Sequence, residues 1–197
     1  MLITTTPAPN GAHGTLTLPQ VASMLGISVA GARKLVDAGV LAKPTPVSAV
    51  ASLAARSSLH ITDGEITVLR TGPQVLDDTD PDRVHMGYDE AMTDQEAEDG
   101  NLRWWRCEPE RVLRSGLFLV TISTIPLALY EVTDCLTPDS APRHHFAGNL
   151  IARHVGEQGT WRAASQPTII TPDEVNTIMS SRVYTRSGGP IAYLGEN

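Results

Sequence analysis

The chain has 197 residues, of which 41% are hydrophobic and 19% are charged, and its formal net charge at pH 7 is −7. These proportions are close to globular averages, so they exclude wholesale disorder and a collagen-like composition. The longest apolar-dominated run, Leu117 to Val132, is interrupted by polar residues and is shorter than the roughly 20 residues that a spanning helix needs. We therefore expect a folded protein that does not span a membrane.

Charge is unevenly distributed along the chain. The first 60 residues contain a single acid, Asp37, and four basic residues, whereas the rest of the chain is strongly acidic. Such a split indicates a module that faces nucleic acid, joined to a part with another role. The four basic residues are Arg33, Lys34, Lys43 and Arg56.

Residues 1–14 are rich in Thr, Pro, Gly and Ala and have no hydrophobic periodicity, which predicts a flexible arm. They also lack the basic and apolar regions of a secretory signal. A cytoplasmic location is therefore expected.

Three short helices are predicted between residues 15 and 60. Thr17 is suited to cap the first helix because Gln20 follows three residues later, and Gly26 is suited to end it. Ser28 is the expected N-cap of a second helix, which ends at Gly39. Apolar residues at helical spacing then predict a third helix that ends near Arg56.

The segment Leu16 to Leu41, LTLPQVASMLGISVAGARKLVDAGVL, resembles the helix-turn-helix of the excisionase and MerR-like group of winged DNA-binding domains. The resemblance implies that the second helix enters the major groove of double-stranded DNA while the first crosses the backbone. Ala32, Leu35 and Val36 form the expected buried stripe of the second helix. The expected DNA contacts are Ser28, Val29, Ala30, Arg33 and Lys34, with Lys43 in the segment that follows.

The second helix departs from the usual pattern because Val29, Ala30 and Gly31 are small. Small residues allow a close approach to DNA and contact with thymine methyl groups. The alternative is a degenerate module that serves protein contacts or dimerisation. The sequence leaves both interpretations open.

Residues 61–99 are predicted to form a hairpin followed by an acidic connector. Alternating apolar residues flank the turn signal Asp63-Gly64, which favours a hairpin that belongs either to a wing or to the next domain. Ten acids and only one base, Arg83, then lie between Asp77 and Asp99. Their spacing does not fit a calcium-binding loop, so a solvated linker is expected.

Residues 100–197 are predicted to form a β-rich domain, which makes the fold class α+β. The expected strands favour a small barrel or a strongly bent sheet over a parallel sheet, because no strand precedes a helix long enough for a crossover. The pattern is similar to small PUA-like barrels, which implies a module that binds a ligand or nucleic acid. A short helix is expected to begin at Thr171. The strands are predicted at Leu102 to Cys107, Leu117 to Ser123, Leu127 to Thr133, His145 to Arg153, Arg182 to Tyr184 and Ile191 to Leu194.

Few residues in the β-rich part suggest chemistry. One ring of Trp104-Trp105 is expected outward, beside arginines, where it is suited to stack on a base. Arg143 and the pair His144-His145 are chemically suggestive, but only His154 is nearby as a further ligand, so no metal site is predicted. Cys107 and Cys135 are expected to be core thiols. The expected contacts in this part are Trp105, Arg106, Arg143 and His144.

The sequence therefore favours a sequence-specific DNA-binding protein, either a transcriptional regulator or an excisionase-type recombination directionality factor. We expect it to bind as a homodimer formed through the β-rich domain, because one short recognition helix buries little surface. The alternative is a phage- or defence-associated interaction protein whose β-rich domain binds modified nucleic acid or a protein partner. Neither an enzymatic activity nor a cofactor is predicted.

Overall fold

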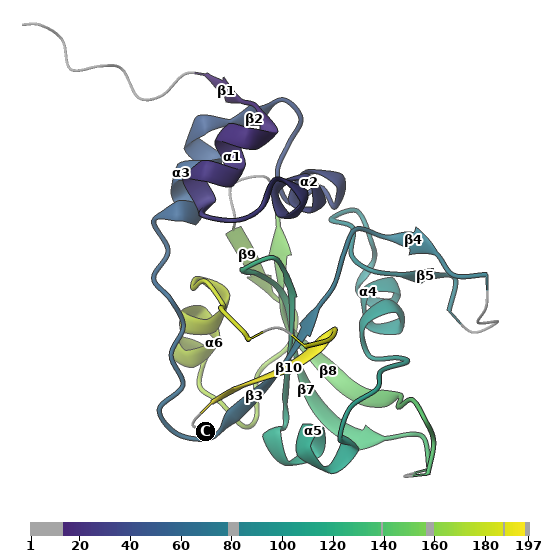
Figure 1. Cartoon of the computed structure of the whole chain (residues 1–197). Helices are drawn as coiled ribbons and strands as arrows, with labels where there is room; N and C mark the ends of the chain where they lie inside the picture. The colour runs from purple at the N-terminus through teal and green to yellow at the C-terminus, as the bar shows by residue number, and fades with distance from the viewer. Residues whose placement is uncertain (1–13, 79–82, 139, 157–159, 187, 196–197) are drawn as a thin grey trace, which may run out of the picture.

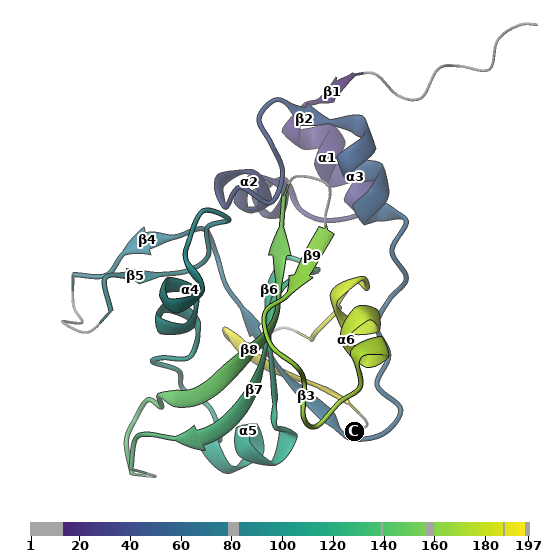
Figure 2. The same cartoon turned by 180° about the vertical axis from the view of Figure 1, so that it is seen from behind.

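The computed structural model describes residues 14–78, 83–138, 140–156, 160–186 and 188–195. A unit of three short helices lies at one end of a mixed six-stranded sheet, as Figures 1 and 2 show from opposite sides. This arrangement confirms the expected α+β class. The predicted flexible arm lies outside the described residues, except for Gly14.

The three helices of this unit are α1 (Leu18–Leu25), α2 (Val29–Asp37) and α3 (Val47–Ala54). The predicted caps are present: Gln20 Oε1 accepts a hydrogen bond from the Thr17 backbone N–H at 2.9 Å, and Ser28 Oγ accepts one from the Gly31 N–H at 3.0 Å. Gly26 ends α1 with a φ of 62°, which an L side chain rarely adopts. Two-residue strands, β1 (Thr15–Leu16) and β2 (Thr45–Pro46), pair beside these helices.

The six strands of the sheet lie in the order β10-β3-β6-β7-β8-β9. The β3–β6 pair is parallel and the other four pairs are antiparallel. Since β9 and β10 occupy opposite edges, the described strands form an open sheet rather than the barrel that was one of the two expected forms. Their bounds are β3 (Glu65–Arg70), β6 (Leu117–Ile122), β7 (Ile125–Cys135), β8 (Phe146–Val155), β9 (Thr160–Ala163) and β10 (Ile191–Gly195).

The hairpin expected around Asp63-Gly64 is wrong, because only Glu65–Arg70 forms a strand there, and it pairs with β6 and β10. Four consecutive residues of β3, from Ile66 to Leu69, are buried. A continuous buried run is typical of an interior strand covered on both faces. One strand of the sheet therefore comes from before the expected boundary at residue 99. It pairs in parallel with β6, so the sheet is mixed, whereas the sequence favoured a small barrel or a bent sheet over a parallel sheet.

The crossover from β3 to β6 contains more structure than the expected linker. It includes the short hairpin β4 (Val75–Leu76) and β5 (His85–Met86), and the helices α4 (Asp94–Asn101) and α5 (Pro109–Ser115). Thr93 and Glu96 form a capping box that starts α4. Two of the acids, Asp80 and Asp82, lie outside the described residues.

Two of the strands predicted in the second half are wrong. Residues 102–107 contribute only an isolated bridge between Trp105 and His144, and residues 182–184 only a bridge between Ser58 and Arg182. Neither segment lies in the main sheet. Residues 102–107 lead from α4 to α5, and residues 182–184 lie beside the chain that leaves α3.

Each face of the sheet is covered by different elements. On one face, Val175 and Met179 of α6 (Pro172–Met179) share a cluster with Leu119 and Leu129. On the other face, Leu102 and Val112 share a cluster with Phe118 and Tyr130. In Figures 1 and 2, α6 and α4 lie on opposite sides of the sheet.

The helical unit packs on one end of the sheet. Ile122, Ile125 and Leu127 of the β6–β7 hairpin and Tyr88 belong to the same buried cluster as Leu25 and Leu35. A backbone hydrogen bond also joins the helical unit to the crossover segment, because the Glu90 N–H donates to the Ala38 carbonyl at 3.0 Å. The helices and the sheet therefore share a core.

Candidate nucleic-acid interface

The second helix, α2, has a buried side and an exposed side. Gly31, Ala32 and Leu35 are buried, in agreement with most of the predicted stripe, and Val36 is half-buried. The exposed side carries all the predicted contacts of this helix together with its N-cap, namely Ser28, Val29, Ala30, Arg33 and Lys34. The sequence therefore identified a set of residues that the structure brings together on one surface.

This exposed surface contains two pairs at helical spacing. Val29 and Arg33 lie four residues apart, as do Ala30 and Lys34, so each pair stacks along the helix. Val29 is 45% exposed although it is apolar. Lys43 is also exposed, in the segment between α2 and α3.

Beside α2, the turn between β6 and β7 comes very close to the helix backbone. A Cβ placed on Gly31 would lie 2.6 Å from Ser123 Oγ, so a side chain at this position would require the Ser123 hydroxyl to move. Gly31 therefore serves packing against the sheet, whereas the sequence suggested close approach to DNA for the small residues of this helix.

A hollow of about 540 Å³ opens between α2 and the sheet. Ala30 and Lys34 line it from the helix, Arg70 from the end of β3, and Ser123 from the β6–β7 turn. Among the described residues that line it, two are cationic and none is acidic. Its walls are therefore positively charged in a protein whose net charge is negative.

Sequence reasoning did not select Arg70 or Ser123. The Arg70 guanidinium donates to the Gly189 carbonyl, and its Nε atom is buried without a hydrogen-bond partner in the described part of the chain. The only signal in the sequence was a basic residue at the end of an apolar run, and that run was expected to form a hairpin.

The four contacts predicted in the β-rich part differ in exposure. The Trp105 indole N–H donates to the Asn101 carbonyl at 2.6 Å, and its ring packs against the core. His144 is 4% exposed, with Nδ1 at 3.2 Å from Thr137 Oγ1. Arg106 and Arg143 are exposed. The two aromatic candidates therefore contribute to packing, and only the two arginines remain on the surface.

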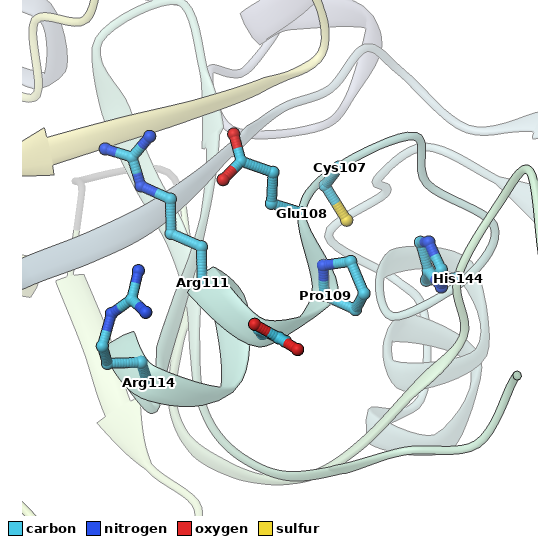
Figure 3. Close-up of a pocket in the computed structure, with 7 residues that line it drawn as sticks. Cys107, Glu108, Pro109, Arg111, Arg114 and His144 are labelled. Atoms are coloured by element: carbon cyan, nitrogen blue, oxygen red, sulfur yellow. The ribbon is translucent and has the colours of Figure 1, made fainter. Parts of the chain in front are cut away.

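A second hollow, of about 440 Å³, lies beside α5 and is shown in Figure 3. Its lining mixes both charges, because Glu108 and Glu110 lie near Arg111 and Arg114. Arg111 is already engaged: its Nε donates to Glu65 Oε1 at 2.8 Å.

Cys107 points into this second hollow, and burial, followed by the charges of Cys135 and Glu108, raises the pKa of its thiol to about 11. The thiol is therefore neutral at physiological pH, which makes it a weak nucleophile. Cys107 and Cys135 are both half-buried free thiols packed against the core, in agreement with the predicted role.

The third histidine considered as a ligand, His154, has a structural partner. Its side chain is 1% exposed, and Nδ1 lies 2.9 Å from Glu90 Oε2. The Gly156 N–H donates to the other oxygen of the same carboxylate. Among the described residues, no group of three or more His, Cys, Asp or Glu side chains is arranged to hold a metal ion.

Comparisons with known proteins found no family model, no curated protein and no solved structure that matches the chain. Within the described residues, none of the helices has the length and apolar character needed to cross a bilayer.

Proposed function

We propose that this protein binds double-stranded DNA sequence-specifically, as a transcriptional regulator or an excisionase-type recombination directionality factor. The observation that carries the proposal is the exposed surface of α2, where Arg33 and Lys34 lie beside Val29 and Ala30. In helix-turn-helix proteins the second helix of the pair presents its N-terminal half to the major groove. Arginine there is suited to guanine, and small apolar side chains are suited to thymine methyl groups.

Replacement of Arg33 tests this proposal directly. The side chain is exposed, so Arg33→Ala is expected to leave the fold intact and to weaken specific binding by about 1–3 kcal/mol if the contact is bidentate to guanine. Binding is measured by fluorescence anisotropy on duplexes from the genomic neighbourhood of the gene, with thermal unfolding as the check of the fold.

Arg114→Ala is the matched control, because Arg114 is exposed on α5, away from α2 (Figure 1). Equal affinities of the wild type and both variants, all of them folded, would contradict the proposed role of α2.

Dimerisation on DNA is part of the proposal. A single short helix with small side chains buries little surface, and two half-sites supply the remainder. The mass of the full chain is measured by light scattering, free and on its operator. A complex that contains one chain per operator would contradict this part.

A second function, binding of a protein partner, is supported by the β4–β5 hairpin. Val75, Leu76 and Val84 are 52%, 72% and 65% exposed, and Met86 is 36% exposed. A cluster of exposed apolar side chains is typical of interaction surfaces. Duplex binding that is weak, lost at physiological salt and indifferent to sequence would favour this function over the first. Neither proposal includes a catalytic step or a cofactor.

A further inference from the structure

We propose that the hollow between α2 and the end of β3 binds a phosphate group, which in the DNA complex is a backbone phosphate. The inference rests on the proposed function, because that function makes DNA the source of the phosphate. It adds a residue of the sheet, Arg70, to the contacts that the sequence predicted on α2 and in the segment after it.

The first argument is the convergence of cations from distant parts of the chain. Lys34 reaches the hollow from α2, and Arg70 reaches it from the end of β3. Ser28, Thr71 and Ser123 line the same hollow and supply hydroxyl groups. Ammonium, guanidinium and hydroxyl groups are the donors that proteins use for phosphate oxygens.

The second argument is that these two cations have no carboxylate partner within the described residues. Several arginines elsewhere in the structure are neutralised by carboxylates: Arg83 pairs with Asp77, Arg111 with Glu65, and Arg162 with Asp94. Lys34 and Arg70, in contrast, form no ion pair there. Two unneutralised cations that line one hollow make its electrostatic potential positive, which favours a bound anion.

The third argument is the position of the hollow relative to the exposed surface of α2 that carries Arg33. Ala30 and Lys34 line the hollow, and each directly follows a residue of the proposed DNA contact, Val29 and Arg33 respectively. The hollow therefore adjoins the proposed base-contacting residues around the helix. A phosphate held by Lys34 and Arg70 would therefore set the position of the duplex relative to Arg33. Contacts of this kind fix register and orientation without reading the base sequence.

The test uses the full chain and the substitutions Lys34→Gln and Arg70→Gln, singly and together, with Arg114→Gln as the control. Arg70→Gln removes the contact between the Arg70 guanidinium and the Gly189 carbonyl, which can disturb the loop that contains Gly189. Lys34 is exposed, so Lys34→Gln is expected to fold in either case. Two measurements are made on each protein: the thermal midpoint in inorganic phosphate against chloride at equal ionic strength, and the salt dependence of duplex binding.

Phosphate is expected to raise the midpoint of the wild type and of Arg114→Gln, and to have no effect on the double variant. The slope of log K against log salt is expected to fall by about 1 for each cation removed, with the sequence preference unchanged. A reduced slope without a response to free phosphate also supports the site, since the phosphate is then bound only within DNA.

The two proposals fail differently. Duplex binding with the same slope in all variants, together with no phosphate response, would overturn the phosphate site and leave the proposed function standing. A phosphate response that depends on Lys34 or Arg70, in a chain that does not bind duplex DNA, would overturn the proposed function and leave the phosphate site. A reduced slope in Arg114→Gln equal to that in Lys34→Gln would overturn the site, because any surface cation then has the same effect.

Discussion

Gly31 of α2 and Ser123 of the β6–β7 turn pack so closely that a Cβ on Gly31 would lie 2.6 Å from Ser123 Oγ, a distance that requires the hydroxyl to move. Ser123 has a φ of 56° and is the one residue other than glycine with positive φ in the described part of the chain. Glycine costs a helix about 1 kcal/mol relative to alanine. The close contact with Ser123 offsets part of the helix propensity that an alanine at position 31 would gain.

A double-mutant cycle on this pair is the first prediction. Gly31→Ala alone is expected to stabilise the protein by less than the roughly 1 kcal/mol of helix propensity, because Ser123 Oγ must rotate away from the new Cβ. Ser123→Gly removes Oγ and tolerates positive φ, so in that background Gly31→Ala is expected to be more stabilising. Urea denaturation of the four proteins gives the coupling energy.

The difference between the two backgrounds decides the outcome. If Gly31→Ala stabilised the protein equally in both, the contact between Gly31 and Ser123 would contribute nothing to stability. Gly72→Ala is the control for a glycine without a close contact. No atom outside its chain neighbours lies within 4 Å of a Cβ built on Gly72, and its φ is not positive, so its effect is expected to be the same with and without Ser123→Gly.

The features predicted correctly from the sequence are those fixed by neighbouring residues. Caps such as Thr17, Ser28 and Gly26 act within one turn of helix, so the bounds of α1 and α2 followed from local chemistry. The place of β3 depends instead on β6, about 50 residues later, and on β10. Arg70 was missed for the same reason, because only the sheet brings it to α2.

The second prediction concerns the buried Arg153, whose side chain is 4% exposed. Its guanidinium donates to the carbonyl oxygens of Met92, Asp89 and Glu90. Arg153→Met leaves these carbonyls without their donor and is expected to lower the free energy of unfolding by about 3–5 kcal/mol.

The control for Arg153 is Arg162, which contacts the same carboxylate, Asp94, from an exposed position. Arg162→Met is expected to cost less than about 1 kcal/mol, because exposed ion pairs contribute little. Equal losses in urea denaturation would show that Arg153 does not stabilise the segment around Glu90.

The third prediction follows from the pKa of Cys107, which burial raises to about 11 from the ordinary value of 9.0. At pH 8 the thiolate fraction in the folded chain is then roughly 100-fold lower than in the unfolded chain. In a Cys135→Ala chain, alkylation of Cys107 is expected to be slower in the folded state by about that factor. Mass spectrometry in buffer and in urea measures both rates.

The same shift has a consequence for stability at high pH. Since the unfolded chain loses the Cys107 proton first, the free energy of unfolding is expected to fall as the pH rises from about 9 to about 11. Cys107→Ala removes this contribution. An alkylation rate in the folded chain equal to that in urea would contradict both expectations.

The last prediction concerns residues 100–197, for which the sequence predicted a separate β-rich domain. This fragment lacks β3, which lies between β6 and β10 and buries Ile66, Val68 and Leu69. Expressed alone, it is expected to show no cooperative thermal transition, with or without chelator, because two neighbouring strands lose their shared partner.

In the full chain, Val68→Asp places a charge at a fully buried position of β3 and is expected to abolish the transition. Leu76→Asp changes an exposed residue of β4, the next strand along the chain, and is expected to leave the free energy of unfolding within about 0.5 kcal/mol of the wild type. A cooperative transition in the fragment, or equal effects of the two substitutions, would mean that β3 is not required by the sheet.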